Sequence, residues 1–70
     1  MSVFPNPTTD VLNINSQSKV KSVKVYDATG KKANVSLQGK QVDVRNLAKG
    51  VYILNVTTEN GTESVKFIKK

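Results

Sequence analysis

Residues 51–56 constrain the fold more than any other part of the chain. Five of these six residues are β-branched, aromatic or leucine, in a chain that is 37% hydrophobic overall. A short apolar run of this kind, without proline, predicts a β-strand that is covered on both faces. Because side chains alternate along a strand, one face would carry Tyr52, Leu54 and Val56, and the other Val51 and Ile53.

The rest of the chain is poorer in apolar residues and predicts half-buried strands. Alternation of apolar and polar residues recurs in several short segments, with turn signals between them about every eight to twelve residues. The residues expected to face inward in these segments are Leu12, Ile14, Val23, Val25, Val42, Val44, Val65 and Phe67. About seven short strands and no long helical period predict a small all-β fold, an antiparallel β-sandwich or barrel.

Four residues are expected to define this fold, and one irregularity needs an explanation. Gly30 is predicted in a tight turn and Gly50 in a sharp turn that leads into residues 51–56. Leu47 is predicted to fill the loop before that strand with its apolar side chain, and Tyr52 to lie in the core.

Val20 is out of register with the alternation that follows it, which a β-bulge near residues 21–22 would reconcile.

The composition argues against catalysis. The chain has 70 residues, enough for one domain, with no Cys and no His. Thiolate chemistry is therefore excluded, and the usual general base and commonest metal ligand are missing. The five acidic residues fall in predicted turns or at outward strand positions. We expect no enzyme activity, no metal and no cofactor. No segment approaches the roughly 18 apolar residues of a membrane-spanning helix.

The formal net charge of +6 allows two interpretations. The first is that the chain attracts polyanions at long range. The second is that the lysines occupy solvent-facing strand positions, where they protect sheet edges from aggregation. Nucleic-acid binders add exposed aromatic platforms to such charge, and only Tyr26 is a candidate here. Nucleic acid is therefore not an expected partner. A generic β-sandwich module that binds carbohydrate or another polyanion stays an alternative.

Four motifs, in order and over essentially the whole chain, resemble the C-terminal sorting domains of type IX (Por) secretion cargo. The first is Phe4-Pro5-Asn6-Pro7 followed by Asp10 and Leu12-Asn13-Ile14. The others are Val23-Lys24-Val25-Tyr26-Asp27 with Gly30-Lys31, the segment of residues 47–56, and the basic end Lys66-Phe67-Ile68-Lys69-Lys70.

The resemblance implies an immunoglobulin-like β-sandwich of seven strands that serves as a secretion signal. Such a domain is fused behind a passenger protein, so residues 1–70 would be one domain taken from a longer protein. It would cross the periplasm and be recognised by the outer-membrane type IX machinery of Bacteroidetes-type bacteria. A sortase-like peptidase commonly removes it, and the passenger is then released or attached to anionic lipopolysaccharide at the cell surface.

The recognition element should be exposed and rigid, so that little entropy is lost on docking. Proline rings restrain the corner formed by Pro5, Asn6 and Pro7, with Asp10 close behind. The lysines Lys66, Lys69 and Lys70 place positive charge at the chain end, and the last strand offers an edge for strand pairing. These seven residues are the recognition candidates. The sequence does not specify the oligomeric state.

Overall fold

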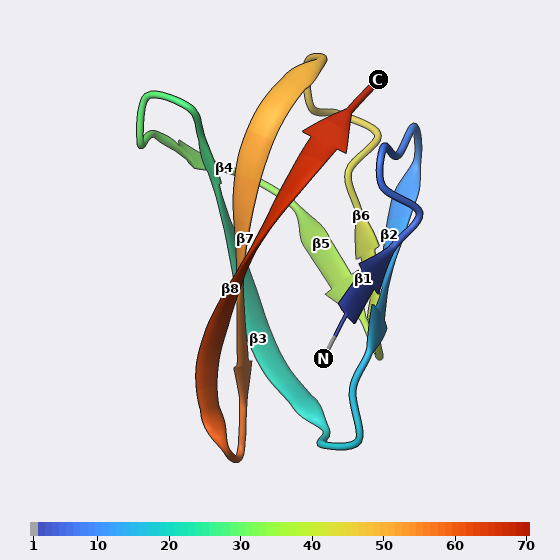
Figure 1. Cartoon of the computed structure of the whole chain (residues 1–70), viewed down its shortest axis with the longest axis vertical. Coiled ribbons are helices and arrows are strands. Elements are labelled where there is room, and N and C mark those ends of the chain that lie inside the picture. Colours follow the sequence, from blue (N-terminus) through green and yellow to red (C-terminus); the bar gives the residue numbers. More distant parts are fainter. Residues whose placement is uncertain (1) are drawn as a thin grey trace.

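The computed structural model describes residues 2–70 as two four-stranded antiparallel sheets packed face to face (Figure 1). One sheet contains β1 (Ser2–Phe4), β2 (Val11–Asn15), β6 (Gln41–Asp43) and β5 (Ser36–Gln38), in that order. The other contains β4 (Lys32–Ala33), β3 (Val20–Asp27), β7 (Gly50–Thr58) and β8 (Gly61–Lys69). The predicted all-β sandwich is confirmed. Met1 lies outside the described residues, which include no helix able to cross a membrane.

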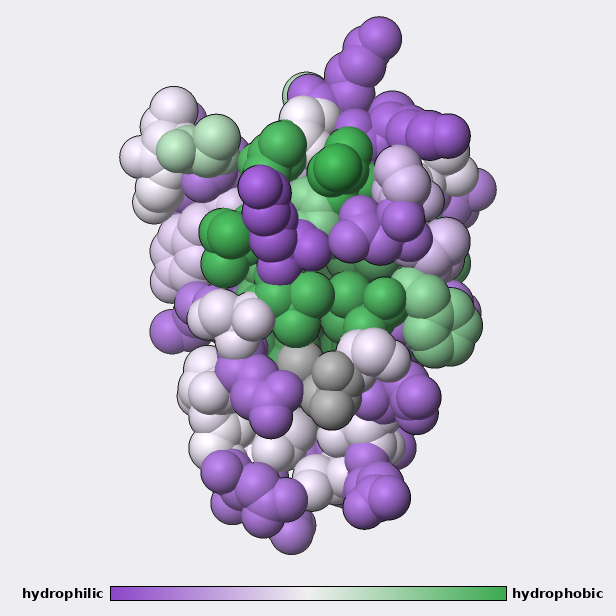
Figure 2. Space-filling model, in the orientation of Figure 1, coloured by the Kyte–Doolittle hydropathy of each residue, from purple (hydrophilic) through white to green (hydrophobic). Residues whose placement is uncertain are grey.

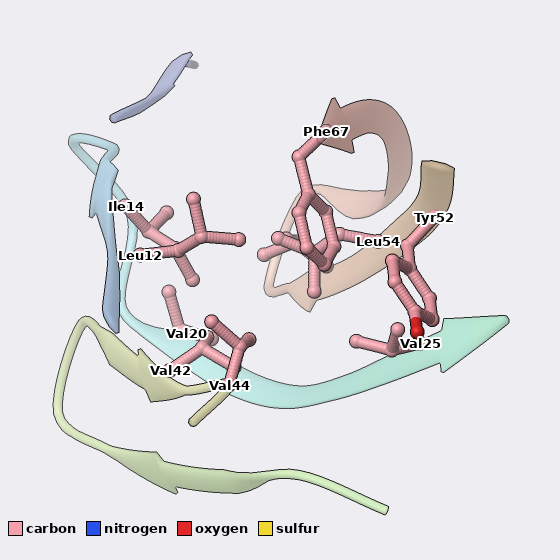
Figure 3. Packing of buried hydrophobic residues seen from close by; sticks show 10 residues of the cluster. Leu12, Ile14, Val20, Val25, Val42, Val44, Tyr52, Leu54 and Phe67 are labelled. Carbon is pink, nitrogen blue, oxygen red and sulfur yellow. The ribbon is translucent and has the colours of Figure 1, made fainter. Parts of the chain in front are cut away.

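The core lies between the two sheets, where side chains from both layers point toward each other (Figure 3). Ten apolar residues are buried there: Leu12, Ile14, Val20, Val25, Val42, Val44, Tyr52, Leu54, Val56 and Phe67. Most of the predicted inward positions are therefore confirmed, and Val23 and Val65 are half-buried. Alternation is strict in β2 and around β6 because each strand has one neighbouring layer to pack against.

The irregular spacing of Val20 has the predicted cause. In the pairing of β3 with β7, Val20 lies opposite Thr58 and Ser22 lies opposite Thr57, so one residue of β3 is inserted at this point. Such a bulge shifts the alternation by one position. Val20 and Val25 consequently share the inward face, although five positions separate them, and both are buried.

The prediction that residues 51–56 are covered on both faces is wrong. Tyr52, Leu54 and Val56 are buried, but Val51 and Ile53 are 39% and 37% exposed. The strand β7 is central within its sheet, between β3 and β8, so its backbone is paired on both sides. A two-layer sandwich nevertheless covers only one face of each sheet. The outward side chains of β7 therefore meet solvent.

Tyr52 connects the core to the loop that precedes β7. Its ring stacks on Phe67, with 5.5 Å between centroids, and its hydroxyl donates a hydrogen bond of 2.6 Å to the carbonyl of Ala48. Leu47, in the same loop, packs against the core. Gly50 begins β7 with a φ of +155°, and Gly30 has a φ of +88° in the turn after β3. At Gly30 a side chain would be strained, because L-residues rarely adopt this conformation.

The two faces of β7 predict opposite responses to substitution. Leu54→Ala, at a position with no exposure, should lower the free energy of unfolding by about 2–5 kcal/mol, because it leaves a cavity in the core. Ile53→Thr keeps a β-branched side chain on the open face and should cost about 1 kcal/mol or less. Urea unfolding followed by circular dichroism measures both. Equal losses for the two variants would contradict the open outer face.

Candidate functional site

Most of the predicted recognition residues, but not Asp10, meet at one edge of the β4-β3-β7-β8 sheet. We call residues 5–10, which connect β1 to β2, the N-terminal corner. Pro5, Asn6, Pro7 and Asp10 are all exposed. The corner lies beside the second half of β8, so that residues near the two ends of the chain are neighbours. The structure thus brings the proline corner together with the basic end of the chain.

Asn6 contacts the backbone of β8 through its side-chain amide. Its Oδ1 accepts a hydrogen bond of 3.0 Å from the N–H of Ile68, and its Nδ2 donates one of 3.2 Å to the carbonyl of Lys66. A carboxamide offers the same donor and acceptor as a peptide group. Asn6 therefore pairs with the edge of β8 much as a neighbouring strand would.

Thr8 continues this pairing with its own backbone. The Thr8 N–H donates to the carbonyl of Ile68 at 2.9 Å, and the Thr8 carbonyl accepts from the N–H of Lys70 at 2.8 Å. The side chain of Thr8 is buried, and its hydroxyl donates to the carbonyl of Val11 at 2.6 Å. Thr8 is not among the predicted recognition residues, since threonine after proline is also an ordinary turn residue and carries no signal of a distant partner.

The four hydrogen bonds from Asn6 and Thr8 to β8 occupy the strand edge that was predicted to be open to a partner. The peptide groups of Lys66, Ile68 and Lys70 that face away from β7 are already bonded to the corner. Unpaired edges invite strand addition, and covering an edge with a loop removes that opportunity. The basic end of β8 is therefore not an open edge, and strand pairing could take place only nearer to the β7–β8 turn.

The three terminal lysines differ in exposure. Lys66 and Lys70 are exposed, whereas Lys69 is 8% exposed. Lys69 shares the inward face of β8 with Phe67, because side chains two positions apart point the same way. Its aliphatic stem is covered, and its Nζ donates to the carbonyl of Lys70 at 3.2 Å. The expectation that Lys69 presents charge at the surface is wrong.

Asp10 lies close to an ion pair at the end of β6. Its carbonyl accepts a hydrogen bond of 2.9 Å from Val44, and Asp43 contacts Arg45 at 2.8 Å. Hydrogen bonds from the Arg45 side chain and backbone lower the pKa of Asp43 to about 2. The hydrogen bond with Asp43 and the negative charge of Asp43 raise the pKa of Arg45, and the charge of Asp10 makes a smaller contribution.

Asp27 organises the turn between β3 and β4. Its Oδ1 accepts hydrogen bonds from the Thr29 hydroxyl, the Thr29 N–H and the Lys31 N–H, at 2.6, 2.9 and 2.9 Å. The Thr29 hydroxyl bond is the largest cause of the lowered pKa of Asp27. Both shifted carboxylates are therefore held ionised by turn contacts, which suits a structural role and not proton donation near neutral pH. Among residues 2–70, no three His, Cys, Asp or Glu residues form a metal-binding group.

A hollow of about 380 Å³ lies at the end of the sandwich near the β2–β3 and β7–β8 turns. Amide and hydroxyl side chains dominate its lining, which comprises Asn15, Ser16, Gln17, Ser18, Val56, Thr58, Asn60 and Glu63. A sugar-binding module would add an aromatic side chain to such a surface, and none lines this hollow. Tyr52 and Phe67 are buried in the core, and Tyr26 is half-buried.

Asn6 should stabilise the domain through its contact with β8. Asn6→Ala removes two partly solvated hydrogen bonds and should lower the free energy of unfolding by about 1 kcal/mol. It should also speed hydrogen exchange of the Ile68 amide, which Asn6 Oδ1 protects. Asn34→Ala, at another exposed asparagine, is the matched control. Urea unfolding and NMR hydrogen exchange measure these effects, and an unchanged Ile68 exchange rate would contradict the contact.

Acid should weaken the domain through Asp27 and Asp43. Both folded pKa values lie below the unfolded value of 3.8, so their stabilising contribution is complete above that value. It is lost as the pH falls through the folded pKa, which for Asp43 is about 2. Asp43→Asn should therefore flatten the dependence of the unfolding midpoint on pH between about 5 and 2. Asp10→Asn is the control, and an unaltered pH profile in Asp43→Asn would contradict the assignment.

Comparison with known proteins agrees with the resemblance of these motifs to a known family. Residues 2–70 match the family described as the secretion system C-terminal sorting domain. The chain is also 42% identical over 67 residues to beta-agarase D of Zobellia galactanivorans. That alignment covers 94% of this chain but 14% of the relative, so the chain spans a small part of the length of the protein it matches.

No solved structure matches the chain. The family match extends over every described residue, from β1 to the end of the chain, and includes the corner and the strand it contacts. The chain therefore belongs to the family of Por (type IX) secretion system C-terminal sorting domains and is a secretion signal.

Proposed function

We propose that the domain is a non-catalytic label that the secretion machinery recognises in its folded form. Its direct partners are outer-membrane components of the type IX system, and its passenger is attached in cis. The domain passes through the periplasm and reaches the cell surface or the medium with the passenger. A sortase-like peptidase then removes it, and anionic lipopolysaccharide is a further partner at the surface.

The observation that supports recognition of the folded form is the contact between the corner and β8. Asn6 and Thr8 bond to residues 66–70, so the first and last of the family-like motifs form one structure only after the chain has folded. An unfolded chain would present these motifs apart. A machinery that reads them together can therefore distinguish a finished domain from an unfolded one.

The contacts divide the seven recognition candidates into two groups. Asn6 and Lys69 are engaged within the domain, the first with the backbone of β8 and the second among the inward side chains. Pro5, Pro7, Asp10, Lys66 and Lys70 have exposed side chains that a partner can reach. We assign recognition to this second group and a fold-defining role to Asn6 and Lys69, together with Gly30, Leu47, Gly50 and Tyr52.

Export of a fused reporter tests the proposal. A periplasmic reporter that carries residues 2–70 at its C-terminus should reach the medium or cell surface of a type IX-competent host. It should stay in the periplasm of a secretion-deficient strain. Lys66→Gln with Lys70→Gln should lower export without unfolding the domain, because both side chains are exposed. Retention of the wild-type fusion in the competent host would contradict the proposed function.

Deletion of residues 66–70 cannot replace these point substitutions. It would remove Phe67, which is fully buried and stacked on Tyr52, together with every β8 partner of the corner. Loss of export would then report unfolding. Lys19→Gln with Lys49→Gln removes the same charge from two exposed loop positions and is the matched control.

A further inference from the structure

The two outer faces of the sandwich differ in chemistry. On the β1-β2-β6-β5 sheet, outward positions carry mainly amides, hydroxyls and a carboxylate, among them Ser2, Asn13, Asn15, Ser36, Gln38, Gln41 and Asp43. On the β4-β3-β7-β8 sheet, one half of the outer face is apolar. The first face is therefore the more polar of the two, although Phe4 and Val11 are also outward on it.

The apolar residues of the second face are contiguous. Val51 on β7 lies directly opposite Ile68 on β8, and Ile53 lies opposite Tyr26 on β3. Val51, Ile53 and Ile68 are 39%, 37% and 43% exposed. We call these four residues, including Tyr26, the apolar patch. Directly paired positions are about 5 Å apart, so they form one surface and not scattered contacts.

Lysines border the apolar patch. Lys66 lies opposite Ile53 on the β8 side, and Lys32 lies opposite Tyr26 on β4. Lys24 shares the face two positions before Tyr26. The only ion pair in residues 2–70 is that of Arg45 with Asp43, so these three lysines have no carboxylate partner within the described chain. No Asp or Glu occupies an outward strand position of this sheet.

The polar half of the same face lies toward the β7–β8 turn. Its outward residues are Ser22, Asn55, Thr57, Thr62 and Ser64. Figure 2, which views the molecule from the side of β1 and β8 and not directly onto this outer face, shows hydrophobic surface in the upper and middle parts and a hydrophilic lower end. The apolar patch is therefore confined to one end of the sheet.

We infer that the apolar patch and its lysines are the surface by which the domain docks on the secretion machinery, an inference that rests on the proposed function. The partner surface is a protein surface with an apolar centre and carboxylates around it. The three free lysines favour carboxylates by charge complementarity. Val and Ile hold few rotamers, so ordering them on docking costs little.

The side chains favour a protein surface over a lipid surface. Segments that lie in a membrane interface insert large residues such as Trp, Phe or Leu to a depth of about 5–10 Å. The apolar patch instead consists mainly of short β-branched side chains on a paired, rigid sheet. The edge of β8 beside it is occupied by Asn6 and Thr8, which leaves the face as the route of approach.

Two pairs of variants test the docking surface in the reporter fusion. Ile53→Thr with Ile68→Thr should reduce export at least about tenfold, because it removes the apolar centre. Val11→Thr, which removes an outward apolar side chain on β2 of the other sheet, should change export less than about twofold. Lys24→Glu with Lys32→Glu should also reduce export at least about tenfold, whereas Lys19→Glu with Lys49→Glu, with the same net charge, should not.

Binding measurements separate the outcomes. The purified fusion should sediment with outer-membrane vesicles from the competent host and not with protein-free vesicles made from the phospholipids of those membranes, without lipopolysaccharide. Circular dichroism confirms that each variant is folded. Folded patch variants that are exported like the wild type would overturn the docking surface while leaving the proposed function intact. Equal binding to the protein-free vesicles would overturn the assignment of a protein partner.

Discussion

Burial of one face of β7 against the opposite sheet is the interaction on which the rest of the structure depends. Leu54 and Val56 are fully buried, and Tyr52 connects this row to Phe67 and to the preceding loop. A domain of 70 residues buries a limited fraction of its surface, so a single central strand carries a large share of the core. The sheets remain together because this row packs in the same core as Leu12, Val42 and Val44 of the opposite layer.

The sequence allowed the fold to be predicted where its pattern was local. A spacing of a few residues was enough to predict the alternation around Leu12 and Val42, the turn at Gly30 and the bulge after Val20. The structure contains all of these features. The coverage of β7 was predicted wrongly. A continuous apolar run indicates only that both faces prefer to be buried, and whether a third layer exists depends on the whole chain.

The candidate site was less accessible to prediction for the same reason. The proline corner and the terminal lysines were recognisable as motifs, but their mutual contact joins positions about 60 residues apart. No local pattern indicates that Asn6 would bond to a peptide group of β8 or that Thr8 would be buried. Lys69 was predicted to lie at the surface because it is charged. It points inward because it is two positions from Phe67 on the same strand, and such side chains share a face.

The bonds from Asn6 and Thr8 to β8 also depend on the fold of the whole domain. Because Asn6 and its partners on β8 are 60 and 62 residues apart in the sequence, these bonds form only when the two ends of the domain come together. Closing so long a loop is entropically expensive, and the cost is offset only once the core beneath it has assembled. The peptide edge near Ile68 is therefore open in the unfolded chain and is covered only when the two ends of the domain meet, so this contact is a marker of the completed fold.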